Sequence, residues 1–228
     1  MVSSYLQLED KHCIDIWSIA LNKTDINEAE LLCILDKAEQ QRYQRLHINH
    51  RHSFLLSHAA CRHILSRYTH YSASEIEYSL NEHGKPGLAN SPYTFNLSHS
   101  HDLAIIAIGT GTDIGVDVEY LKSKPGYMKL AKRFFSPEEY EYLSRQKDSQ
   151  LQEHFFQLWT RKEAFIKALG TGLSTPLKSF DSSHAEKIIF NGDNELDWHQ
   201  QDLTLDPAYK ACVVQNTKIK KIRYYVYA

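Results

Sequence analysis

Two segments decide the fold of this chain: GVDVE at residues 115–119 and WTRKEAFIK at residues 159–167. The first segment alternates apolar and acidic residues at the period of a strand, so its two acids share one face. The second has the apolar spacing of a helix and sets Glu163 and Lys167 one turn apart. Carboxylates and a lysine on rigid elements suit a hard divalent cation that holds a phosphate ester. The two segments therefore predict metal ligands on a strand and a helix: Asp117, Glu119 and Glu163.

The same two periodicities, together with glycine and proline breaks, predict the elements on either side. Strands are expected at residues 13–19, 93–98, 103–108 and 114–120, helices at 27–46, 51–69, 136–145 and 149–169, and a β-rich region at 173–228. Residues 109–113 contain two glycines between expected strands, which predicts a hairpin turn. A dinucleotide-binding loop would need a third glycine and a following helix.

A weak internal repeat indicates how these elements are arranged. Residues 14–16 resemble 116–118, Phe54 has a counterpart in Phe156, and residues 104–107 resemble 211–214. We therefore expect an α+β fold made by pseudo-twofold duplication, in which each half is a small, mainly antiparallel sheet packed against a long helix. The halves are placed at residues 1–112 and 113–228. Residues 60–62 (ACR) are the expected first-half counterpart of the Glu163 region, which predicts a single, asymmetric site.

Composition excludes several classes of protein. The 228 residues are 42% hydrophobic and 24% charged, with a net charge of −2, so neither a membrane span nor the basic excess of a nucleic-acid binder is indicated. The four cysteines form no CxxC pair, and the first residues lack the pattern of a signal peptide. These features predict a cytoplasmic protein with no membrane and no nucleic-acid partner.

Candidate phosphate contacts lie near the predicted carboxylates. FNLSHSH at residues 95–101 places Ser98 and His99 at a strand end, and Lys85 lies on a stiff turn between a glycine and a proline. A Ser–His nucleophile pair is disfavoured, because adjacent residues on an extended chain point to opposite sides. Each feature alone also has a simpler interpretation: solvated acids, a polar strand end, or surface lysines. Their joint occurrence favours a phosphate site.

Five ordered motifs carry a resemblance to a known family. They are GKP at 84–86, FNLSHS at 95–100, IGVDVE at 114–119, FFSPEE at 134–139 and WTRKEAFIKALGTGL at 159–173. In this succession the chain resembles the 4′-phosphopantetheinyl transferases of the surfactin-synthetase-activating type. The resemblance implies the fold of this family. It also implies transfer of the phosphopantetheine arm of coenzyme A to a serine of an apo acyl or peptidyl carrier protein, with release of 3′,5′-adenosine bisphosphate.

The resemblance also implies roles for individual residues. Mg²⁺ would be held by the three acids, Lys85 would approach the 3′-phosphate of coenzyme A, and Glu163 or a metal-bound water would take the serine proton. Lys167 would neutralise charge at the reacting phosphorus. The expected catalytic residues are Glu163 and Lys167, and the expected coenzyme A contacts are Lys85, Ser98, His99, Lys162, Lys167 and Arg51.

The sequence departs from the family pattern near its start, where Ala38 and Gln41 occupy two positions that are commonly basic. Arg42, Arg45 or Arg51 would compensate. Two alternative functions use the same residues: a magnesium-dependent nucleotide pyrophosphate hydrolase, and a non-catalytic module that binds carrier proteins. A duplicated chain needs no second subunit to build a cleft, so a monomer is expected.

Overall fold

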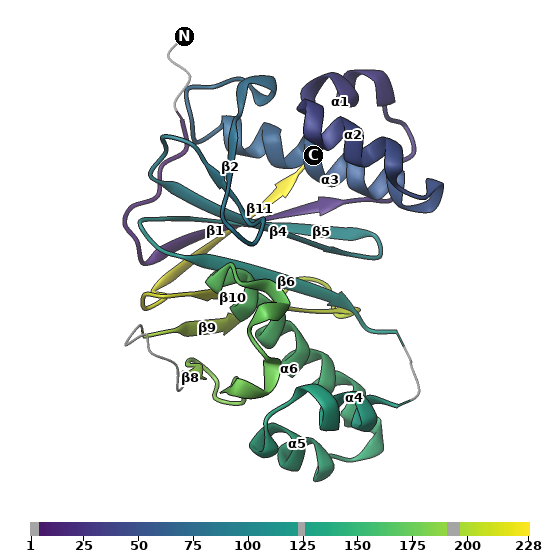
Figure 1. Cartoon of the computed structure of the whole chain (residues 1–228), viewed down its shortest axis with the longest axis vertical. Coiled ribbons are helices and arrows are strands. Elements are labelled where there is room, and N and C mark those ends of the chain that lie inside the picture. Colours follow the sequence, from purple (N-terminus) through teal and green to yellow (C-terminus); the bar gives the residue numbers. More distant parts are fainter. Residues whose placement is uncertain (1–4, 123–125, 191–196) are drawn as a thin grey trace.

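The computed structural model describes residues 5–122, 126–190 and 197–228 and has four layers. A four-stranded sheet, ordered β11-β1-β5-β4, packs against a three-stranded sheet, ordered β6-β10-β9. Helices α1 to α3 cover the outer face of the first sheet, and α4 to α6 cover the second (Figure 1). In the described part of the chain, no helix is both long and apolar enough to cross a membrane.

The elements occur in the same order in both halves. The first half comprises β1 (Cys13–Ala20), α1 (Glu28–Ile34), α2 (Lys37–Arg45), α3 (Ile48–Ser66), β2 (Tyr78–Leu80), β3 (Pro86–Leu88), β4 (Tyr93–Ser100) and β5 (Leu103–Thr110). The second comprises β6 (Ile114–Tyr120), α4 (Tyr127–Phe134), α5 (Pro137–Ser144), α6 (Asp148–Leu169), β7 (Phe180–Asp181), β8 (Ile189–Phe190), β9 (His199–Asp202) and β10 (Tyr209–Gln215). Three short 3₁₀ turns lie at Ala73–Glu75, Gly172–Ser174 and Leu177–Ser179, and β11 (Lys221–Tyr227) ends the chain.

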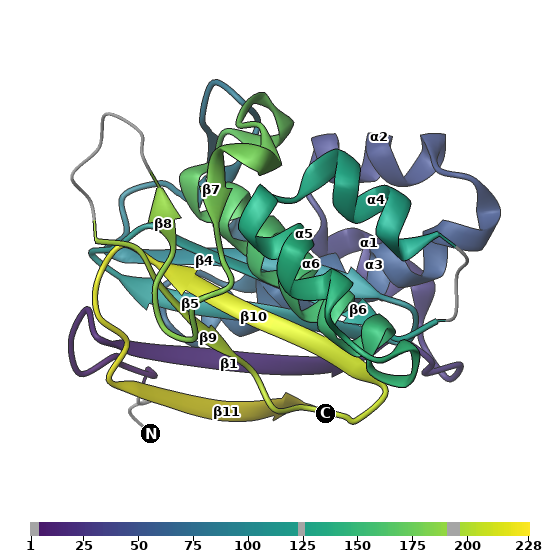
Figure 2. The same cartoon turned by 90° about the horizontal axis from the view of Figure 1, so that it is seen from below.

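Strand order confirms the predicted α+β duplication. The order β1-β5-β4 in one sheet matches β6-β10-β9 in the other, and these pairings are all antiparallel. The final strand, β11, pairs in parallel with the outer side of β1 (Figure 2). The division at residues 112/113 stays a prediction, and β11 is an element of the second range that lies in the first sheet.

Two buried ion pairs set the register of the duplication. Glu39 belongs to the capping box that begins α2 and contacts Arg62 of α3 at 2.6 Å. Glu139 belongs to the capping box that begins α5 and contacts Lys162 of α6, also at 2.6 Å. Corresponding members of the two pairs lie 100 positions apart in sequence. The long helices α3 and α6 are therefore equivalent, and their charged anchors are in register.

This register corrects the expected equivalences on the long helices. His154, and not Phe156, is the counterpart of Phe54. His63, and not the segment 60–62, is the counterpart of Glu163, although neither choice places a carboxylate in the first half. The alignment of residues 104–107 with 211–214 is also wrong. Ala104 faces the core beneath α3, whereas Ala211 lies in the core between the sheets. That alignment has an odd spacing, and an odd shift turns every strand side chain to the opposite face.

Several predicted boundaries differ from the structure. The predicted hairpin at 109–113 is wrong, because β5 and β6 belong to different sheets and the turn carries the chain from one to the other. The predicted helix 27–46 is divided, since Leu35 is extended and Asp36 caps a new helix. Helix α4 and the short strands β2 and β3 were not predicted. The strand at 114–120 and the capped helix starting at Ser136 are confirmed.

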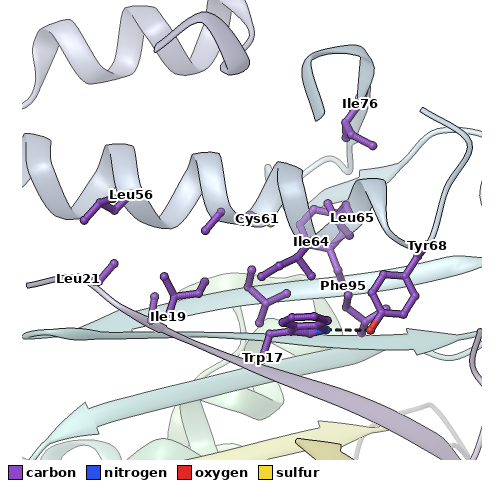
Figure 3. Close-up of a cluster of buried hydrophobic side chains, with 14 residues drawn as sticks. Trp17, Ile19, Leu21, Leu56, Cys61, Ile64, Leu65, Tyr68, Ile76 and Phe95 are labelled. Atoms are coloured by element: carbon purple, nitrogen blue, oxygen red, sulfur yellow. Dashed lines mark hydrogen bonds between the residues drawn. The ribbon is translucent and has the colours of Figure 1, made fainter. Parts of the chain in front are cut away.

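The hydrophobic core beneath α3 fixes the first sheet. It contains Trp17 of β1, whose indole Nε1 donates to the hydroxyl of Tyr68 at 2.8 Å (Figure 3). Tyr68 in turn donates to the buried carboxylate of Asp15 at 2.6 Å. A separate core between the sheets contains the valines of β6 and the residues of β5 and β1 that face the second sheet. Both faces of the first sheet are thus covered, which holds β4 rigidly beside β6.

Candidate active site

Strand β6 presents its two acids to α6. Its valines face the core between the sheets, so the alternate residues Asp117 and Glu119 face the helix that carries Glu163 and Lys167. The four residues predicted from the sequence to bind the metal or to take part in catalysis therefore lie together. They come from two rigid elements, as a precise binding site requires.

Gly115 allows helix α6 to lie close against this strand. A Cβ at Gly115 would lie 2.1 Å from the carbonyl oxygen of Ala164 and 2.3 Å from the amide nitrogen of Ala168. Real Cβ atoms do not approach backbone this closely, so only glycine fits. The close approach places the polar face of α6 over Asp117. The helix then ends at Gly170, whose φ of 70° is the left-handed conformation that glycine adopts readily.

Asp117 is buried, and its two oxygens have different surroundings. Oδ1 accepts hydrogen bonds from Lys167 Nζ at 2.6 Å and from Ser98 Oγ at 2.8 Å. Oδ2 is buried and has no hydrogen-bond partner. Buried polar atoms are nearly always satisfied, so an unpartnered carboxylate oxygen calls for an explanation. A cation would supply the missing partner.

The neighbouring carboxylates have raised pKa values. Burial raises the pKa of Glu163 to about 7, and repulsion from Asp117 and Glu119 adds to the effect, against the opposing charge of Lys167. Burial and repulsion from Asp117 also raise the pKa of Glu119. Lys167 is hydrogen-bonded to Asp117 alone of the three carboxylates. The arrangement has an excess of negative charge that a divalent cation would neutralise.

A side-chain ladder joins β4 to β6 across the boundary between the sheets. Asn96, Ser98 and Ser100 alternate along β4, and their oxygens accept the backbone amides of Val116, Val118 and Tyr120 at 2.9, 3.4 and 3.1 Å. These side chains occupy the edge of β6 that faces away from β10. The two sheets are therefore connected by side-chain hydrogen bonds where backbone pairing stops.

The serines of this ladder also contact the acids. Ser98 Oγ donates to Asp117, and Ser100 Oγ donates to Glu119 Oε2 at 3.0 Å. Sequence reasoning treated Ser98 as a phosphate contact and missed Ser100 and Asn96. The available signal was the two-residue alternation within NLSHS, which puts all three on one face. Ser98 lies beside the carboxylates, hydrogen-bonded to one of them.

Two of the predicted coenzyme A contacts, Lys162 and Arg51, do not lie with the acids. Lys162 is fully buried, pairs with Glu139, and donates to two backbone carbonyls, so its assignment to the site is wrong. Lys162 occupies the position equivalent to Arg62 of the first half, and both side chains are buried against a glutamate. Arg51 donates to the carbonyls of Leu46 and Gln44 at the end of α2, away from the acids.

Lys85 joins the two halves of the molecule. Its Nζ donates to the carbonyls of Ile114 in β6 and Ala168 in α6, both at 2.9 Å. Burial lowers its pKa to about 8, and Asp113 partly opposes that shift. Asn81 of the same loop donates to the carbonyl of Gly170. The ammonium therefore anchors the β2–β3 loop to the end of α6, and its use as a phosphate contact has no support in this geometry.

His99 is itself exposed and lies on the face of β4 opposite the serines, the face that carries Phe95 and Leu97 into the core beneath α3. Partial burial lowers the pKa of its imidazole, and repulsion from His58, Lys167, Arg42 and His50 adds to the effect. Arg42 stacks near the ring of Phe54 at 5.3 Å. The resemblance had named Arg42 among the substitutes for missing basic residues, and the structure brings it into the electrostatic surroundings of His99.

The sequence of this chain matches those of known proteins. Residues 113–214 match the model of the 4′-phosphopantetheinyl transferase superfamily, a segment that contains Asp117, Glu119, Glu163 and Lys167. The 4′-phosphopantetheinyl transferase HetI of Nostoc sp. strain PCC 7120 is 37% identical over 166 residues, which cover 71% of this chain and 70% of that protein. The 4′-phosphopantetheinyl transferase Sfp of Bacillus subtilis strain 168 is 38% identical over 167 residues, covering 71% and 73%. The chain belongs to the 4′-phosphopantetheinyl transferase superfamily.

Membership makes the protein an enzyme of the transferase class. A solved structure, the holo-[acyl-carrier-protein] synthase of Thermotoga maritima, is 23% identical and covers 47% of this transferase and 64% of its own chain, with a TM-score of 0.38.

Proposed function

We propose that this transferase moves the 4′-phosphopantetheine arm of coenzyme A to a serine hydroxyl of an apo acyl or peptidyl carrier protein, with release of 3′,5′-adenosine bisphosphate. Family membership supports the reaction class. One observation supports the site: the unpartnered, buried Oδ2 of Asp117 lies among carboxylates whose pKa values are raised. Both halves of the site come from one chain, which supports a monomer.

A magnesium ion fits the donor chemistry of this site. Asp117, Glu119 and Glu163 would hold it, since Mg²⁺ takes carboxylate oxygens and retains positions for substrate phosphates. In the described residues, no three acidic, histidine or cysteine side chains converge into a ready-formed metal site. The fit therefore rests on the bare oxygen and the unneutralised charge. When bound, the ion would neutralise charge on the pyrophosphate.

The protein's own residues account for the remaining chemistry. The serine oxygen of the carrier protein would attack the phosphorus that bears the pantetheine arm, and the bridging bond of the pyrophosphate would break. The leaving oxygen would depart with adenosine bisphosphate. Glu163 would take the serine proton, because a carboxylate held beside the pyrophosphate can act as a general base towards the attacking hydroxyl. Lys167 would supply fixed positive charge beside the reacting phosphorus.

The test combines the protein with coenzyme A, Mg²⁺ and a panel of apo-carrier proteins from fatty-acid, polyketide and peptide synthesis. Intact mass spectrometry should show the phosphopantetheine adduct on at least one carrier, with an equal amount of adenosine bisphosphate released. A carrier whose acceptor serine is replaced by alanine should stay unmodified. Adenosine bisphosphate formed equally fast without a carrier would identify a hydrolase instead. Binding of the carrier without any adduct would identify a non-catalytic module.

A further inference from the structure

The two serines of the side-chain ladder each have a single proton to donate, and the structure accounts for both. Ser98 donates to Oδ1 of Asp117, and Ser100 donates to Oε2 of Glu119. In each acid one oxygen is thereby engaged. Oδ2 of Asp117 is buried without a hydrogen-bond partner, and the bond from Ser100 engages Oε2 of Glu119 and not Oε1. The ladder thus distinguishes one oxygen from the other in both acids.

The hydroxyl of Ser98 has no remaining capacity for another partner. Besides donating to Asp117, it accepts from Lys167 Nζ at 2.9 Å and from the amide of Val118 at 3.4 Å. A hydroxyl offers one donor and two acceptor positions, and all three are used. A direct bond from Ser98 to a substrate phosphate would require one of these to break. The contacts therefore favour action through the carboxylate over contact with substrate.

We infer that Ser98 and Ser100 are positioning residues that leave one oxygen of Asp117 and one of Glu119 free for the cation, and that this selects Mg²⁺ over Ca²⁺. The inference rests on the magnesium site proposed above and adds a determinant of metal choice. Asp117 is held doubly, by Ser98 and Lys167, whereas Glu119 is held by Ser100 alone. Ser100 is therefore the more sensitive of the two positions.

The selectivity follows from how the two ions are coordinated. Mg²⁺ is small, requires near-octahedral geometry, and takes one oxygen from each carboxylate. Ca²⁺ accepts six to eight oxygens and readily binds both oxygens of one carboxylate. A hydroxyl that donates to the second oxygen competes with that bidentate mode. Removal of the hydroxyl releases the second oxygen, which gives Ca²⁺ a ligand that Mg²⁺ cannot use.

The decisive variant is Ser100→Ala, studied by metal binding without substrate. Bound Mn²⁺ can be followed by electron paramagnetic resonance of the free ion, with Mg²⁺ and Ca²⁺ as competitors. Measurements at pH 8 limit the effect of protonation, because the Ser100 hydrogen bond itself lowers the pKa of Glu119. We expect the affinity for Mg²⁺ to fall roughly tenfold, as is usual when the partner of a metal ligand is removed. The affinity for Ca²⁺ should fall less, so the Mg²⁺/Ca²⁺ affinity ratio decreases.

The chain offers a matched control in the same ladder. Asn96 accepts the amide of Val116 but does not contact an acid, so Asn96→Ala should damage the ladder without changing the metal ratio. Ser100→Thr keeps the hydroxyl and should restore the wild-type ratio. Thermal unfolding of all three variants separates loss of structure from loss of selectivity.

The possible outcomes are distinguishable. A lower Mg²⁺/Ca²⁺ ratio in Ser100→Ala alone supports the inference. Equal weakening of both ions in Ser100→Ala, or the same change of ratio in Asn96→Ala, would show that the serine only maintains the structure. A wild-type protein that binds none of the three ions would overturn the magnesium site itself. Adduct formation on a carrier tests the transferase reaction independently of all these results.

Discussion

Burial, with added repulsion from Asp117 and Glu119, raises the pKa of Glu163. Its proposed role is to accept the proton of the carrier protein's serine, so the carboxylate is needed for the reaction and not for folding. We expect Glu163→Gln and Asp117→Asn each to reduce transfer to a carrier protein at least about 100-fold, the usual effect of removing a group that stabilises charge in the transition state. The thermal unfolding temperature of Glu163→Gln should not decrease, because that change removes one of the repelling charges.

Glu153→Gln is a suitable control for this experiment. Glu153 lies on the same helix, but at the surface, where it pairs with Lys210. Its substitution should leave the transfer rate unchanged. Near-normal rates in both site variants would refute the assigned roles, and a loss of rate in Glu153→Gln would indicate that any change on this helix disturbs activity.

The same charge makes stability depend on pH. The pKa of Glu163 rises from an ordinary value of 4.5 to about 7 on folding, so the folded protein binds its proton more tightly than the unfolded chain. The resulting stability is fully present below pH 4.5 and is lost as pH rises towards and through 7, on the order of 3 kcal/mol at most. The thermal unfolding temperature of the wild type should therefore decrease more between pH 5 and pH 8 than that of Glu163→Gln. Added Mg²⁺ should counteract the loss at pH 8 and have little effect at pH 5. Parallel curves for the two proteins would contradict this account.

At the scale of elements, the contact between β6 and α6 depends on a missing side chain. A Cβ at Gly115 would lie 2.1 Å from backbone of the helix, so Gly115→Ala must displace α6. We expect a loss of at least about 2 kcal/mol in the free energy of unfolding, measured in urea, because backbone cannot yield as a side chain does. Transfer activity should fall further than stability explains, since Glu163 moves with the helix. Gly87→Ala is the control: its Cβ would make an ordinary 3.4 Å contact with Ser79. Equal stability of the two variants would show that α6 adapts freely.

Lys162 and Glu139 anchor α5 to α6 and allow a second test at this scale. Both side chains are fully buried and lie 2.6 Å apart. Lys162→Met leaves a buried carboxylate without its partner and should cost about 3–5 kcal/mol in urea unfolding. The double variant Lys162→Met, Glu139→Gln removes both charges and should regain most of that loss. If the double variant were less stable than the single one, the hydrogen bonds that Glu139 accepts from Ser136 and Ser182 would outweigh the cost of its unpaired charge.

Elements with local signals could be predicted from the sequence, and their partners could not. Ser136 and Glu139 indicate a helix start within four residues, and the alternation of GVDVE indicates a strand wherever it pairs. The grouping of Asp117 with Glu163 followed from these local signals because the motifs lie in adjacent elements of one half. The pairing of β6 with β10 and the burial of Lys162 depend on contacts between distant segments. A helix pattern does not distinguish a lysine that snorkels to solvent from one that finds a buried carboxylate, so the assignment of Lys162 to the site was wrong.

The duplication also explains, at the scale of the whole molecule, why the site is single. In the second half, β6 is flanked by the side-chain ladder of β4, which holds the acids. In the first half, the corresponding edge of β1 is paired with β11, and Tyr225 of that strand stacks on Trp17 at 4.6 Å. His63, the counterpart of Glu163, is hydrogen-bonded to Tyr227. In the first half, aromatic side chains of the C-terminal strand therefore occupy the position at which the second half carries its carboxylates.

An ion pair between Asp15 and Arg223 holds the C-terminal strand β11 against β1. Asp15 is completely buried in β1, and Arg223 of β11 binds both of its oxygens, at 2.6 and 2.8 Å. Arg223→Met leaves the carboxylate with Tyr68 alone, so we expect a loss of about 3–5 kcal/mol in the free energy of unfolding, measured in urea. Asp15→Asn in the same background should recover part of it, since the buried charge is then absent. Lys221→Met is the control, because Lys221 pairs with Glu9 at the surface and should cost less than about 1 kcal/mol. Because the two sheets share one core, unfolding should remain a single transition in every variant. A separate early transition in Arg223→Met, with transfer activity retained, would instead show that the second half is stable without the strand that closes the first.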